Sequence, residues 1–157
     1  MRSAIALRRF LQIAVGAILL SFIAGCTNPG TGPTLVLKND VFTGTLQPLG
    51  VDSKQFTVNF SAAPTDLSVT LNSLTAVTGG TPVTGITVGI GLGLPSLSAC
   101  AVQILTPNVT IGQVLPLPGG IGAGTYCVQI SDCPTGSTGC TPQLTQAVTY
   151  NLTVKHY

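Results

Sequence analysis

Few side chains in this sequence could carry out chemistry. The chain has one histidine, His156, and no glutamate, and its carboxylates are Asp40, Asp52, Asp66 and Asp132. Nucleophilic catalysis needs a base beside the nucleophile and a third group that orients the base. We expect His156 to occupy a mobile, solvated strand tip, where such an arrangement is difficult to hold. We therefore predict that the protein has no catalytic residues and is not an enzyme.

The four aspartates could instead form a paired-carboxylate site or a calcium site. All four stand at turn-like strand ends, where a short carboxylate bonds to nearby backbone N–H groups. Two of them could meet at one end of the domain around a calcium ion, although the D-x-D-x-D-G spacing of a calcium loop is absent. We expect structural roles for the aspartates and no cofactor, and calcium stays an open alternative.

The five cysteines fall into two groups. Cys26 directly follows an apolar run, whereas Cys100, Cys127, Cys133 and Cys140 lie in the later part of the chain. An even number of cysteines in an exported chain indicates disulfides. Four thiols allow three pairings, of which we favour Cys133–Cys140 together with Cys100–Cys127. Zinc is disfavoured, because no C-x₂-C pair occurs.

Strand alternation raises a difficulty for the pair Cys100–Cys127. Cys127 alternates with the presumed core residues Tyr126 and Val128 and so faces outward, whereas Cys100 shares a face with Ile104. A disulfide requires the two Cα atoms to lie within about 7 Å. We therefore expect a strand end, an edge or a bulge at this point.

The amino-terminal segment has the composition of a secretory signal. Three arginines precede the uncharged run "IAVGAILLSFIAG", which is shorter than the roughly twenty apolar residues of a membrane-spanning helix. The end of this run and the cysteine that follows it, Ile23-Ala24-Gly25-Cys26, resemble the lipobox of bacterial lipoproteins. This resemblance implies cleavage before Cys26 and addition of diacylglycerol to its sulfur, which would anchor the mature chain in a membrane.

The same resemblance predicts how the chain is organised. Residues 1–25 would be a signal peptide, residues 26–34 a lipidated cysteine with a flexible tether, and residues 35–157 a single domain in the bacterial cell envelope. Thr27, directly after Cys26, resembles the residues of lipoproteins sorted to the outer membrane, since Gram-negative lipoproteins kept at the inner membrane usually have aspartate at this position. In such a cell we expect the domain to face the periplasm or the exterior.

Charge is sparse in the predicted mature chain. Three lysines stand against four aspartates, a formal charge of −1, and charged residues make up only 6% of the whole chain, against roughly 25% in ordinary domains. No basic patch remains, so nucleic acid is excluded as a partner.

The domain shows period-two alternation of apolar and polar residues almost throughout. Four segments do so clearly, 54–60, 66–74, 124–131 and 147–157, and weaker strands are expected near residues 35, 42, 86, 100 and 111. The glycine-rich runs "GIGLG" (89–93) and "GGIGAG" (119–124) lack the context of phosphate loops and are expected in turns or close packing. Seven to nine short antiparallel strands predict an all-β fold, a single jelly-roll or immunoglobulin-like β-sandwich.

The order of four segments resembles the bacterial pre-peptidase carboxy-terminal domain. The matching residues are Gly44-Thr45-Leu46, Phe56, Gly124-Thr125-Tyr126-Cys127-Val128 and Tyr150-Asn151-Leu152-Thr153-Val154. The resemblance spans residues 41 to 155, with residues 79 to 123 departing from the pattern. It implies a jelly-roll-like sandwich and an accessory place beside secreted enzymes.

These features together predict a membrane-anchored, non-catalytic envelope lipoprotein that acts as a binding or structural module. Its partners would be the membrane, through Cys26, and an envelope protein or polysaccharide. The chain has no tryptophan, which disfavours stacking on sugars. The alternatives are an accessory subunit or inhibitor of a secreted hydrolase and, third, a hydrolase in its own right.

Overall fold

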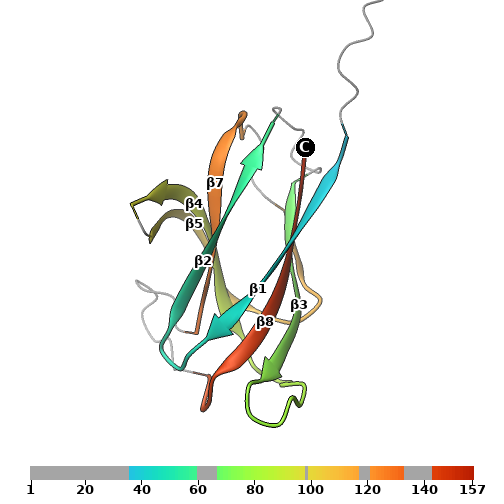
Figure 1. Ribbon diagram of the computed structural model, residues 1–157, viewed down its shortest axis with the longest axis vertical. Helices are drawn as coiled ribbons and strands as arrows, with labels where there is room; N and C mark the ends of the chain where they lie inside the picture. Colours follow the sequence, from blue (N-terminus) through green and yellow to red (C-terminus); the bar gives the residue numbers. More distant parts are fainter. Residues whose placement is uncertain (1–35, 60–66, 98, 117–120, 133–142) are drawn as a thin grey trace, which may run out of the picture. The chain divides into compact units, whose positions relative to one another are not determined.

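Two four-stranded antiparallel sheets make up the part of the chain that the computed structural model describes, residues 36–59, 67–97, 99–116, 121–132 and 143–157. These residues contain no helix. The sheets face each other, as Figure 1 shows, and the side chains between them form a shared apolar core. The all-β class and the β-sandwich predicted from alternation are confirmed.

Eight strands are described, and each sheet takes strands from both halves of the chain. In chain order they are β1 (Lys38–Leu46), β2 (Val51–Val58), β3 (Ser68–Ala76), β4 (Val88–Ser96), β5 (Ala99–Val109), β6 (Val114–Pro116), β7 (Gly124–Ser131) and β8 (Val148–His156). One sheet has the order β1-β8-β3-β6 and the other has the order β2-β7-β4-β5. Among the described strands, β4 and β5 are the consecutive strands that pair in one sheet, and every other step from one strand to the next passes from one sheet to the other. The edge strands are β1 and β6 of the first sheet and β2 and β5 of the second.

Alternation in the sequence predicts the buried faces correctly in the strongest strands. On β8 the side chains of Val148, Tyr150, Leu152 and Val154 are at most 1% exposed. The register places Val69 and Leu71 of β3 beside Val154 and Leu152 of β8, so their side chains enter the core from neighbouring strands. The weak strands expected near residues 35 and 42 prove to be one strand, β1, which begins at Lys38.

The glycines of "GIGLG" lie inside β4 and not in a turn. Ile90 and Leu92 point into the core, while a Cβ on Gly91 would lie 2.8 Å from a methyl carbon of Val102, and a Cβ on Gly93 would overlap the carbonyl of Ala101. Strand β5 thus folds across the outer face of β4, and residues Val88–Gly93 are buried on both faces. Glycine allows this close approach because it has no side chain to displace β5.

Candidate functional site

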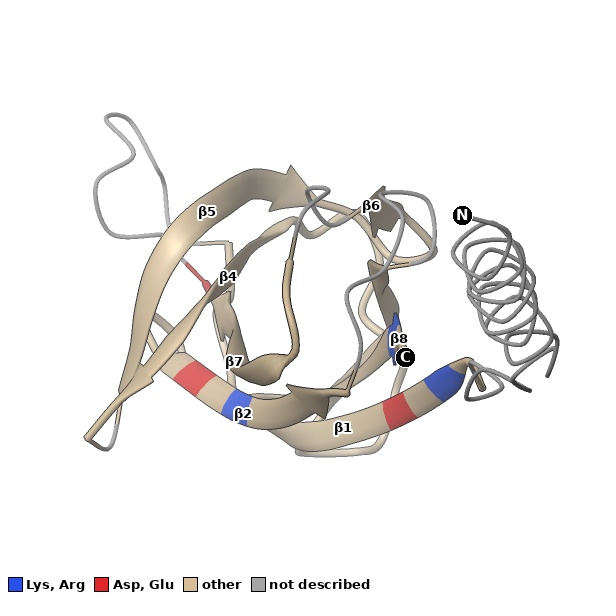
Figure 2. Cartoon of the chain, turned by 90° about the horizontal axis from the view of Figure 1, so that it is seen from above, with Lys and Arg blue, Asp and Glu red and all other residues tan. Residues whose placement is uncertain are grey.

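The described charged residues occupy one part of the sandwich. They lie on β1, on β2, at the end of β8 and directly after β7, as Figure 2 shows. Between Asp66 and Asp132 the sequence contains no lysine, arginine, aspartate, glutamate or histidine. Strands β3 to β7 are therefore free of charge, and we call the surface formed by β4, β5 and β6 the neutral half.

The only histidine is buried, which corrects the expectation of a solvated strand tip. His156 is 0% exposed, because it continues the inward alternation of β8 two residues after Val154. Its ring lies 5.4 Å, centroid to centroid, from the ring of Phe56 on β2. The alternation that identifies Val154 as a core residue predicts this position as well, so the sequence contained the signal.

His156 forms hydrogen bonds through both ring nitrogens. Nε2 lies 2.9 Å from Oδ2 of Asp40, on the neighbouring strand β1, and Nδ1 lies 3.0 Å from the main-chain oxygen of Tyr157. Both oxygens are acceptors, so the ring can donate to both at once only with an N–H at each nitrogen. Neither nitrogen is hydrogen-bonded to a hydroxyl or a thiol of the described residues.

Asp40 is held in its charged form by its neighbours. Burial of the carboxylate acts to raise its pKa, but the hydrogen bonds and positive charges of Lys38 and His156 together outweigh burial and lower the pKa below its ordinary value. The Lys38 Nζ lies 2.8 Å from Asp40 Oδ1. Asp40 therefore fastens the start of β1 to the end of β8.

A second polar pair joins β8 to β2 at the other end of β8. The Tyr150 hydroxyl donates to Asp52 Oδ2 at 2.7 Å, and Lys54 Nζ lies 3.1 Å from the same oxygen. Burial of the Tyr150 phenol, with the nearby Asp52 carboxylate, raises the pKa of Tyr150 well above its ordinary value. A Cβ on Gly44 would lie 2.6 Å from the Tyr150 hydroxyl, so this pair requires glycine there.

The Asp132 carboxylate binds backbone N–H groups. Its side chain is 1% exposed and accepts hydrogen bonds from the N–H groups of Leu49, Gln143 and Leu144 at 2.9 to 3.0 Å. This confirms the structural role expected for this aspartate. Within the described part of the chain, no group of three histidine, cysteine or acidic side chains could hold a metal ion.

Cys100 and Cys127 form the disulfide that the sequence favoured, with an S–S distance of 2.07 Å and Cα atoms 5.8 Å apart. The conflict over strand faces is resolved by a β-bulge in β5. The register passes from Leu92↔Ile104 to Gly93↔Val102, so one residue of β5 is unpaired and the alternation reverses. Cys100 therefore points to the outer face, as Cys127 does, and the disulfide crosses β4 at Gly93.

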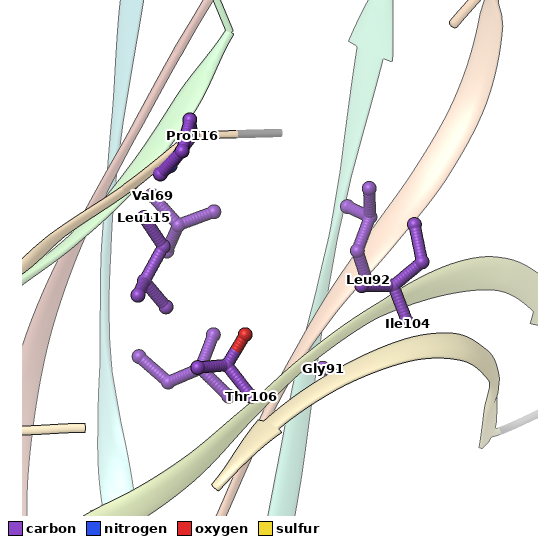
Figure 3. A pocket seen from close by; sticks show the side chains of 8 residues that line it. Val69, Gly91, Leu92, Ile104, Thr106, Leu115 and Pro116 are labelled. Atoms are coloured by element: carbon purple, nitrogen blue, oxygen red, sulfur yellow. The ribbon is translucent and has the colours of Figure 1, made fainter. Parts of the chain in front are cut away.

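The described cavity is too small for a ligand of ordinary size. It measures about 20 Å³ and lies between the sheets, where Val69, Leu115 and Pro116 face Leu92 and Ile104, as Figure 3 shows. Such a volume suits a single water molecule, whereas small-molecule pockets measure roughly 300–1,000 Å³.

Several predicted sites lie outside the described residues. These are the lipidation site Cys26, the second favoured disulfide Cys133–Cys140, and Asp66. No helix among the described residues is long and apolar enough to span a membrane. A scan of protein-family models and a search of curated proteins both gave no match to this chain, so the resemblance to the pre-peptidase carboxy-terminal domain stays a prediction.

Proposed function

We propose that this chain is a lipid-anchored, non-catalytic β-sandwich module of the bacterial cell envelope, and that it binds a neighbour through its neutral half. The observation that carries the proposal is the separation of charge. Asp40, Asp52, Asp132 and His156 are all engaged in contacts that hold the strands together, while the neutral half has no charged group to desolvate on binding.

The neutral half also exposes apolar side chains that the core does not use. Leu94 and Ile104 are 43% and 42% exposed, and Val114 on the edge strand β6 is 59% exposed. Exposed apolar side chains on strands without charge suit contact with a protein or another neutral surface. The lipid anchor would keep these strands close to the membrane and its other components.

Mass spectrometry of the full-length chain, expressed in a bacterium, tests the anchor. We expect an amino-terminal peptide that begins at Cys26 and has the added mass of a diacylglycerol, and we expect the Cys26→Ser variant to lose this mass and the membrane association. An uncleaved leader or an unmodified Cys26 thiol would contradict the anchor.

Photo-crosslinking in intact cells tests the binding surface. A photoreactive side chain at Val114 of β6, on the neutral half, should give a discrete adduct. The same group at Thr45 of β1, the opposite edge strand of the same sheet, should not. Equal labelling at both positions, or none at either, would contradict a binding role for the neutral half.

A further inference from the structure

The β4–β5 hairpin ends in an arm, formed by residues 93–97 and 99–102, that projects to the side of the two sheets in Figure 1. Leu97, directly after β4, is 101% exposed, and Leu94, in the third strand pair from the turn, is 43% exposed. A leucine this exposed buries nothing in its own domain. The arm thus presents apolar surface that the fold does not use.

The backbone conformation at Leu97 is also unusual for a leucine. Leu97 has φ of 52°, in the left-handed region that favours glycine and asparagine. Leu49, in the β1–β2 turn, has a similar φ of 57°, but there the N–H donates to Asp132 at 2.9 Å. At Leu97 an unfavourable backbone conformation coincides with complete exposure of an apolar side chain. Local rules are broken in this way most often where a residue serves function.

The arm is held firmly in place. The Cys100–Cys127 disulfide fastens the arm to β7 at the pair Pro95↔Cys100, next to the turn, and the close approach of Ala101 to Gly93 keeps β5 against β4. A preorganised apolar tip loses little conformational entropy when it is buried against another surface.

The arm is also suited to a medium of low dielectric constant. It contains no charged residue, and neither does the chain on either side of it from Leu67 to Ser131. Charged groups are what make entry into lipid costly, and the hydrogen bonds between β4 and β5 satisfy much of the backbone of the arm internally.

We propose that the tip of this arm inserts Leu97 and Leu94 into the interface of the lipid bilayer that holds the Cys26 anchor, a proposal that rests on the proposed lipidation. Nine residues separate Cys26 from Val36, a length that spans at most about 30 Å when extended. This reach is comparable with the diameter of a small domain. The anchor therefore keeps the arm at high effective concentration beside the bilayer, and the arm sets which face the domain turns toward it.

Single-tryptophan variants test the insertion, because the native chain contains no tryptophan. The full-length lipidated Leu97→Trp protein is reconstituted into phosphatidylcholine vesicles that contain brominated acyl chains, which quench indole fluorescence on contact. The matched control is Leu49→Trp, at another exposed leucine with left-handed φ. We expect quenching about twofold or more stronger at position 97 than at position 49, with a blue-shifted emission. Leu94→Trp gives a second reading should the first variant disturb the turn.

Vesicle flotation of the same samples separates the two proposals. Protein that stays in the aqueous layer overturns the anchor and the insertion together. Protein that floats with an unquenched Leu97→Trp probe, or with equal quenching in both variants, overturns the insertion alone. An emission shift that occurs only in native envelope membranes, and not in pure lipid, likewise overturns the insertion and assigns the arm to a protein partner.

Discussion

Two side-chain pairs fasten β8 to the first two strands, β1 and β2. Near the end of β8, His156 bonds to Asp40 of β1, and near its start Tyr150 bonds to Asp52 of β2. Both pairs combine a buried polar group on β8 with a carboxylate on an edge strand. Because a buried polar group left without its partner is costly, each pair should contribute to stability in a pH-dependent way.

The Asp40→Asn variant should lose acid sensitivity. The pKa of Asp40 is lowered in the folded protein, so its carboxylate stabilises the fold above its unfolded pKa near 3.8, and this stabilisation disappears as the pH falls through the lower folded value. We expect the variant to be about 1–2 kcal/mol less stable at pH 7. Denaturant titrations between pH 6 and pH 2 should show the two proteins converging in acid, and parallel curves would contradict the role of Asp40.

The Tyr150→Phe variant should lose alkaline sensitivity. The raised pKa of Tyr150 means that the buried phenol stays neutral where an unfolded tyrosine ionises, near pH 10. Its contribution is therefore complete below pH 10 and declines above it. We expect the variant to be about 1 kcal/mol less stable at pH 7, with a smaller decline in thermal midpoint between pH 9 and pH 11. A decline as steep as in the native protein would argue against the Tyr150–Asp52 pair.

At the scale of the element, the β4–β5 hairpin is the most unusual part of the fold. Its inner strand is buried on both faces, its outer strand folds over a row of glycines, and a bulge reverses the alternation of β5. These three features depend on one another, because the bulge turns Cys100 outward and Gly93 lets the disulfide cross β4.

Substitution Gly93→Ala should weaken this hairpin. The added methyl group would overlap the Ala101 carbonyl, which is backbone and cannot move without displacing β5. We expect a loss of about 1–3 kcal/mol in unfolding free energy. Gly122→Ala is the control, because a Cβ there meets nothing within 4 Å, and comparable losses in both variants would show that the effect is not specific to the hairpin.

Removal of the disulfide should destabilise the same element. The bond closes a loop with a sequence separation of 27 residues, and loops of this size correspond to about 2–4 kcal/mol. We expect the double variant Cys100→Ser with Cys127→Ser to unfold at correspondingly lower denaturant concentration. Hydrogen exchange should increase first at Ala99–Val109, and an increase confined to β1 and β8 would contradict the assignment of the disulfide to the hairpin.

At the scale of the whole molecule, charged residues are absent from strands β3 to β7, whereas exposed apolar side chains occur on both halves, for example Val41 on β1 and Val114 on β6. The charged side chains on β1 and β2 lie on edge strands, where charge opposes unwanted strand pairing. The other edge strand of the second sheet, β5, is eleven residues long and uncharged, and its bulges and Pro107 interrupt a regular pairing edge.

The scarcity of charge should limit the solubility of the domain away from its anchor. The domain has a net charge close to zero and exposes Val77 and Val114, which are 53% and 59% accessible. The test uses the compact unit Leu35–Tyr157. We expect the double variant Val77→Lys with Val114→Lys to raise the soluble concentration of this unit about 3-fold, with little change in its thermal midpoint. Unchanged solubility would mean that these side chains do not mediate association.

The sequence by itself determines the fold class and most of the core, because strand alternation is a local property. Val148 to Val154 show which face of β8 is buried whatever the strand packs against, and the same pattern extends to His156. Local pattern also predicts that Asp132, directly after a strand, binds backbone N–H groups, but its donors on Leu49, Gln143 and Leu144 lie 83, 11 and 12 residues away, so only the tertiary structure decides which groups they are.

Only the tertiary structure decides which strands become neighbours. The partner of His156 is Asp40, 116 residues away, and the pair forms because β1 and β8 lie side by side in one sheet. The face of Cys100 likewise depends on a bulge that arises where β5 must bend around β4. Such contacts join distant parts of the chain and depend on strand order and register, which alternation within a single strand does not specify.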